Sequence, residues 1–253
     1  MKPLQTDLSI FKKLKLEKPP VAINYCFHKP EGVEKLNKSL GLCEMVKEAQ
    51  DRGKPFYFTK DDENCVGKMF LGMTEDPQPP RRSDGGNLGV KLQVFQSGRP
   101  NLRLRTFIPT LEKGSVNYML YTPFDKIKYE PELFVVTGNP TQAELLLRAM
   151  TTTTGEMYES RSTVVGACSQ LYIYPYVSGK VNYLVAGLSF GMRGRKIYPE
   201  GTIIVSIPHQ WLPIIAQNLK DMEWVPGYNL TRDEFVERDH RITEENIRES
   251  QNP

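Results

Sequence analysis

The chain has 253 residues, of which 39% are hydrophobic and 25% are charged. This is enough apolar material for a substantial core, and it excludes disorder along the whole chain. Lys and Arg exceed Asp and Glu by 33 to 30, and their dispersal among acidic residues argues against a nucleic-acid-binding face. No apolar run approaches the roughly 20 residues that span a bilayer, and the first residues lack a leader-peptide pattern. We therefore expect a cytoplasmic protein that binds neither nucleic acid nor membrane.

The first half of the chain alternates helical and extended patterns. Near-helical spacing of Leu4, Leu8 and Phe11 predicts an amphipathic helix over 4–16. Branched and aromatic residues predict the strand that follows. The predicted elements from there to the middle of the chain are a strand at 21–27, a helix at 43–53, a strand at 56–59, a helix beginning after Thr59 and carrying Cys65, a Pro- and Gly-rich loop at 74–89, a helical stretch near 88–97 and a strand at 116–123.

The second half has a more regular pattern. Residues 132–139 are almost continuously apolar, which is typical of a strand covered on both faces. Asn139 and Pro140 form a helix-start signal, and that helix is expected to end at Gly155. The remaining predicted elements are a helix at 162–174, strands at 182–190 and 201–208, and a helix at 208–219. This alternation predicts an α/β domain over 1–222, with a mixed sheet flanked by helices.

Residues 223–253 form a predicted C-terminal tail of different character. The segment from Thr231 to Ser250 contains seven acidic residues and four Arg, with almost no apolar period. One interpretation is an exposed helix that packs on a partner subunit through Trp224 and Phe235, which would make the protein a homo-oligomer. The favoured alternative is a solvated charged segment.

The cysteines provide the most informative chemical pattern. Cys43 and Cys65 lie 22 residues apart, each near a predicted helix start, where the helix dipole favours the thiolate that binds soft metals. Gly67 would allow close backbone approach to a bulky ligand. The alternative is that these thiols are small buried hydrophobes, since their spacing matches no short iron–sulfur motif. Burial is also the default for Cys26, and tight helix packing for Cys168.

A Gly-rich basic segment, GLSFGMRGRK at 187–196, follows a predicted strand. Its N–H groups, together with Arg193 and Arg195, are suited to an anionic ligand, although it matches no nucleotide-binding motif. RRSDGGNLG at 81–89 is either a lid or anion loop, or an ordinary surface loop. Three tyrosines are candidates to line a pocket, the alternative being simple packing: Tyr172, Tyr174 and Tyr176.

Several segments together resemble the uncharacterised ArCR family, domain of unknown function 169. They are KPPVAINY, LCEMVKEAQDRGKPFYFTKDDENCVGKMFLG, FVVTGNPTQAELLLRAMTTTTG and the stretch from VVGACSQ to IIVSIPHQWL. The resemblance spans roughly residues 5–220 and implies that Cys43, Cys65 and Cys168 form one site with the Gly-rich strand exits. Such proteins often have a further Cys at one exit, where this chain reads LSFGMR at 188–193. Either three Cys bind a cluster with one iron open, or the site is altered or lost.

The resemblance implies no established reaction, but three thiolates suit a [4Fe–4S] cluster with one open iron. The leading hypothesis is an iron–sulfur protein of anaerobic metabolism that acts in redox chemistry or binds a small, anionic substrate. Its metal ligands would be Cys43, Cys65 and Cys168, and its other cofactor-binding residues Gly67, Gly191 and Arg193. One alternative is a metal-free protein that binds or carries a small organic cofactor. The other is a zinc enzyme with three Cys ligands and a water.

Overall fold

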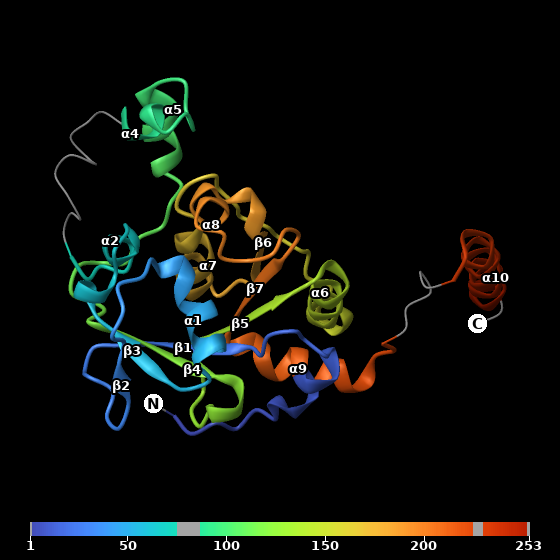
Figure 1. Ribbon diagram of the computed structural model, residues 1–253. Helices are drawn as coiled ribbons and strands as arrows, with labels where there is room; N and C mark the ends of the chain where they lie inside the picture. Colours follow the sequence, from blue (N-terminus) through green and yellow to red (C-terminus); the bar gives the residue numbers. More distant parts are fainter. Residues whose placement is uncertain (1, 75–86, 225–229, 252–253) are drawn as a thin grey trace. The chain divides into compact units, whose positions relative to one another are not determined.

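The computed structural model describes residues 2–74, 87–224 and 230–251. Its centre is a seven-stranded mixed sheet in the order β2-β3-β4-β1-β5-β7-β6 (Figure 1). Only the pairing of β2 with β3 is parallel among the strand pairs of the described residues. The strands are β1 (Val21–Cys26), β2 (Glu34–Lys35), β3 (Phe56–Phe58), β4 (Tyr118–Pro123), β5 (Leu133–Gly138), β6 (Asn182–Val185) and β7 (Ile203–Pro208). The predicted α/β class with a mixed sheet is therefore confirmed.

The described α-helices connect and follow these strands, and none of them precedes β1. They are α1 (Met45–Arg52), α2 (Gly67–Phe70), α4 (Asn87–Lys91), α5 (Gly98–Arg105), α6 (Pro140–Thr154), α7 (Ala167–Ser178), α8 (Phe190–Gly194), α9 (Leu212–Asp221) and α10 (Arg232–Gln251). The predicted start of α6 is confirmed, because the Asn139 side chain accepts a hydrogen bond from the Gln142 N–H at 2.9 Å and Pro140 occupies the first turn.

Five predicted elements differ from the structure, one of them the helical stretch near 88–97, where α4 ends at Lys91 and α5 begins only at Gly98. The N-terminal amphipathic segment forms a 3-10 helix over Leu8–Leu14. The helix expected to carry Cys65 is a 3-10 turn, Lys60–Asp62, followed by the short α2. α7 begins five residues later than predicted, because the left-handed Gly166 (φ 73°) precedes it. The strand expected over 182–190 ends at Val185, and the chain then forms a 3-10 turn and α8.

The main core lies between the sheet and helices α1, α2 and α7. Val21 and Ile23 of β1 face the same cluster as Met45 of α1 and Leu171 of α7, all of them buried. Figure 1 shows α1 and α7 over this part of the sheet. On the opposite face, Phe134 of β5 packs against Phe11, with ring centroids 4.9 Å apart. Since both faces are covered, the nearly continuous apolar sequence of β5 is explained.

The chain separates into two compact units, 1–220 and 221–253. The second unit contains α10, whose residues are all exposed, with Phe235 at 45%. The predicted C-terminal helix is therefore present, and its docking on a partner subunit stays a prediction. Within the described residues, no helix combines the length and the apolar character needed to cross a bilayer.

Candidate functional site

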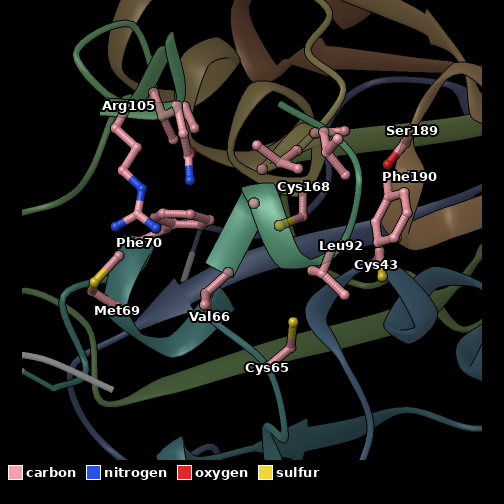
Figure 2. A pocket seen from close by; sticks show the side chains of 18 of the residues that line it. Cys43, Cys65, Val66, Met69, Phe70, Leu92, Arg105, Cys168, Ser189 and Phe190 are labelled. Atoms are coloured by element: carbon pink, nitrogen blue, oxygen red, sulfur yellow. The ribbon is translucent and has the colours of Figure 1, made fainter. Parts of the chain in front are cut away.

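A cavity of about 430 Å³ lies at one end of the α1–α7 layer, and three of the four cysteines line it. Figure 2 shows the side chains of Cys43, Cys65 and Cys168 on its wall. All three are free thiols and partly exposed, whereas Cys26, on β1, is not among the lining residues. The fold therefore brings together the three cysteines that the sequence grouped, from segments up to 125 residues apart.

A buried carboxylate reinforces the backbone bonds of Leu40 to Asp62 and Asn64 that join the Cys43 and Cys65 segments. Glu63 is only 1% exposed. It accepts hydrogen bonds from the N–H of Leu42 at 3.0 Å and from the N–H of Lys68 at 3.2 Å. The first donor precedes Cys43 and the second lies in α2, just after Cys65. Glu63 therefore helps to fix the two cysteine-bearing turns relative to each other.

Cys168 reaches the cavity from the first turn of α7. Gly166 precedes this helix with φ 73°, and no side chain caps its N-terminus. A Cβ on Gly166 would lie 2.8 Å from Ile108 Cδ1, another atom at the cavity wall. Ser169 donates a hydrogen bond from its hydroxyl to the carbonyl of Pro109. These contacts dock the 108–109 segment on the helix start that carries Cys168.

Arg195, which directly follows α8, connects that part of the cavity wall to the segments that carry Cys43 and Cys65. Its guanidinium forms an ion pair with Glu44, which neighbours Cys43. It also donates a hydrogen bond to the Asn64 Oδ1 at 3.3 Å, beside Cys65. The positive charge of Arg195 therefore lies near the segments of both thiols, and at Cys43 it favours the thiolate form.

Burial keeps two of these thiols neutral when no metal is bound. It raises the pKa of Cys43 to about 12, and the neighbouring Cys65 raises that pKa further while Arg195 lowers it. Burial also raises the pKa of Cys168 well above its ordinary value, with contributions from Cys43, Cys65 and the buried Glu63. A bound metal would have to displace these protons.

The raised pKa of Cys43 predicts a loss of stability of the metal-free protein at alkaline pH. The folded state binds this proton more tightly than the unfolded state, so the contribution is complete below pH 9.0 and is lost as pH rises towards about 12. One such thiol changes the free energy of unfolding by up to about 1.4 kcal/mol per pH unit in that window. Urea unfolding at several pH values should show a shallower decline for Cys43→Ser, and an identical decline would contradict the assignment.

The structure places Gly67 in a close packing contact within the protein, whereas close approach to a ligand was expected. It is buried and is not among the residues lining the cavity. A Cβ at this position would lie 2.4 Å from Leu42 Cβ and 3.0 Å from Glu63 Oε1. The glycine therefore allows α2 to pack closely against the turn that contains Cys43.

We expect Gly67→Ala to lower the free energy of unfolding by about 1–3 kcal/mol, because the Leu42 Cβ is tied to the backbone and cannot move away cheaply. Chemical denaturation of the metal-free protein measures this change. Gly194→Ala is the matched control, since a Cβ there meets nothing within 4 Å. Equal stability of the two variants would show that α2 shifts freely.

The other sequence candidates divide between the cavity and the rest of the protein. Gly191 and Arg195 line the cavity, whereas Arg193 does not. None of the three candidate tyrosines lines it either. Tyr172 is buried in the core, the Tyr174 ring lies under the Arg161 guanidinium, and Tyr176 stacks on Tyr25 with ring centroids 4.1 Å apart. Most of the expected loop at 74–89, including 81–86 of the possible anion loop, lies outside the described residues.

Sequence reasoning missed Glu63 and most of the apolar wall. The wall includes Val66 and Phe70 of the α2 region, Leu92 and Phe95 from the α4–α5 region, and Phe190 of α8. These residues are scattered over three segments, and no periodicity connects them. The burial of Glu63 could not be predicted, because this residue lies in an acidic run, DDEN, that is typical of an exposed turn.

Among residues 2–74, 87–224 and 230–251, no group of three His, Cys, Asp or Glu side chains is arranged to hold one metal ion. A single zinc ion binds sulfur at about 2.3 Å and so draws its ligands close together. The thiols of the described residues therefore do not form a preformed site for one metal ion.

Comparison with known proteins gives a family but no activity. The uncharacterised ArCR family, domain of unknown function 169, matches residues 9–218. One relative, "Uncharacterized protein MJ0308" of Methanocaldococcus jannaschii, is 26% identical over 226 residues, which cover 87% of this chain and 95% of the relative. No solved structure matches the chain. Because the match spans the sheet, the cavity and all three cysteines, the chain belongs to the uncharacterised ArCR family.

Proposed function

We propose that the protein binds a [4Fe–4S] cluster through Cys43, Cys65 and Cys168, and that the cluster's remaining iron is open to a small molecule. The observation that carries the proposal is that three of the chain's four cysteines line one cavity. Thiolates are the usual ligands of such clusters, with four as the normal number. Three ligands leave one iron position for substrate or water, and an open metal site acts as a Lewis acid or in electron transfer.

The surroundings of the thiols fit a cluster. The lining is mainly apolar, so it limits access of water, and solvent exposure is one of the factors that set a cluster's reduction potential. Arg195 places positive charge beside Cys43 and Cys65, which would partly offset the negative charge of three thiolates. Cluster assembly would release thiol protons, because burial holds the pKa of Cys43 and Cys168 high.

A second candidate function is binding of a small organic cofactor without a metal. The observation in its favour is the size of the cavity, about 430 Å³, together with its apolar lining. Such volumes and linings are typical of sites for organic ligands. In this case the thiols would remain protonated and act as small apolar wall residues.

Anaerobic reconstitution with iron and sulfide separates the two candidates. A cluster gives visible sulfur-to-iron absorption that is bleached by dithionite or by air. The protein with its cluster should also resist urea better than the metal-free form, because the ligand binds only the folded state. A colourless protein with unchanged stability after reconstitution would favour the organic-ligand function.

A further inference from the structure

The charged side chains of the cavity wall are already engaged within the protein. Arg105 and Arg195 line the cavity, and none of the lining residues in the described part of the chain is an Asp or a Glu. Arg195 forms an ion pair with Glu44, and Arg105 also has a partner. A charged ligand would therefore meet no unengaged charge of opposite sign, and a buried charge without a partner is costly. The charges of the wall thus favour an uncharged ligand.

Most of the remaining wall is apolar and comes from segments that are far apart in the sequence. Its apolar residues include Val66, Met69 and Phe70 around α2, Leu92 and Phe95 in the α4–α5 region, and Phe190 of α8. An apolar molecule that leaves water for this surface gains affinity in proportion to the area it buries, about three- to fourfold for each CH2 group. We therefore expect affinity to rise with the length of the ligand's apolar part.

Two residues of this wall are also exposed to solvent. Leu92, which directly follows α4, is 46% exposed, and Phe190 of α8 is 42% exposed. Because both side chains also line the cavity, its apolar surface continues from the interior to the outside. A ligand with an extended apolar body would cover this surface, whereas a small polar molecule would leave it in water.

Hydrogen bonds between its segments hold the apolar wall in place. The N–H of Leu111 donates to the carbonyl of Phe70 in α2 at 2.7 Å. The side chain of Gln170 in α7 donates to the carbonyl of Phe107 at 3.0 Å. The segment that follows α5 is therefore tied both to α2 and to the helix that carries Cys168. A wall that is ordered before the ligand arrives reduces the entropy cost of binding.

We propose that the cavity binds an uncharged molecule with an extended apolar body and holds it against the three cysteines. The basic segment at 187–196 favoured an anionic ligand, but the pairing of Arg195 with Glu44 argues against one. This inference deepens the proposed function and rests on it for the ligand's place beside the open iron. Binding itself needs only the cavity wall, so the metal-free protein tests the inference separately from the cluster.

The experiment is isothermal titration calorimetry on the full-length, reduced, metal-free protein. Octanol, octanoate and octylamine are probes of equal chain length, and hexanol is a shorter uncharged probe. Octanol should bind at least about tenfold more tightly than either charged probe, because the wall offers neither charge an unengaged partner. Hexanol, which has two CH2 groups fewer, should bind about tenfold more weakly than octanol.

Variants of the two exposed wall residues locate the binding site. Leu92→Asp places a charge in the apolar wall and should weaken octanol binding at least about tenfold. Phe190→Ala removes apolar contact area and should weaken it about three- to tenfold. Leu102→Asp is the matched control for the first variant and should change nothing, because Leu102 of α5 is 43% exposed and does not line the cavity. All three replaced side chains are exposed, so the variants should fold.

Octanoate or octylamine binding as tight as that of octanol, or octanol binding that neither wall variant weakens, would overturn the inference. A dimer that Leu92→Asp dissociates, in a protein that binds no octanol, would assign the exposed apolar surface to a second copy and would also overturn it. Octanol binding by a protein that never incorporates iron would support the inference and refute the cluster. Iron incorporation without octanol binding would refute the inference and leave the cluster standing.

Discussion

Replacement of Cys168 by Ser should lower the iron incorporated on anaerobic reconstitution at least tenfold, and Cys43→Ser and Cys65→Ser should have effects of similar size. Each thiol comes from a different segment of the cavity wall, so none can substitute for another. A serine hydroxyl binds iron far more weakly than a thiolate does. The measurement is iron and acid-labile sulfide per chain after reconstitution and desalting.

Cys26→Ser provides the matched control for this series. Cys26 is also partly buried, and burial raises its pKa to about 11, but it lies on β1 and not at the cavity. Its replacement should leave the iron content unchanged. If all four variants lost iron equally, the binding would be unspecific, and if none lost iron, the three cavity thiols would not be the ligands.

Replacement of Glu63 by Ala should lower the free energy of unfolding of the metal-free protein by about 2–4 kcal/mol. The backbone N–H of Leu42 would lose its acceptor in a buried position and that of Lys68 in a partly buried one, and the loss of a buried acceptor costs about 1–3 kcal/mol. The same variant should reconstitute less well, because the turns of Cys43 and Cys65 would keep only the backbone bonds of Leu40 to Asp62 and Asn64. Urea unfolding, followed by circular dichroism, measures the first effect.

Glu34→Ala is the matched control, since Glu34 forms an exposed ion pair with Arg52. Exposed pairs of this kind contribute about 0–1 kcal/mol. An unfolding free energy of Glu63→Ala that equals or exceeds that of the parent protein would mean that the cost of burying the carboxylate outweighs its two hydrogen bonds.

Much of the fold could be predicted from local patterns. The apolar run at 132–139 and the Asn139–Pro140 helix start predicted the bounds of β5 and α6 closely. Helix caps and continuous apolar segments are local features of the sequence. The prediction of a strand over 182–190 was wrong for its second half. There, Ser189 caps α8 by accepting a hydrogen bond from the Met192 N–H. Short helices of this kind depend on tertiary contacts more than on propensity.

The grouping of the cysteines could be predicted only through the family resemblance, since their spacing matches no motif. Their place on one cavity depends on the strand order and on contacts such as the hydrogen bond from Leu42 to Glu63, which joins residues 21 positions apart. Gly67 was selected because a glycine allows close approach to a ligand, and the close approach that the structure shows is to Leu42. The place of Arg105 on the cavity wall carried no local signal, because the surrounding RLRTFIPTL fits neither a helical nor an extended pattern clearly.

The central claim is that the three-cysteine cavity holds an iron–sulfur cluster. The most direct test is metal and sulfide analysis of the protein purified without oxygen, with the Cys168→Ser variant purified in parallel. The parent protein should contain about four iron and four sulfide per chain, and the variant should contain little of either. Zinc without sulfide, or no metal in either protein, would contradict it.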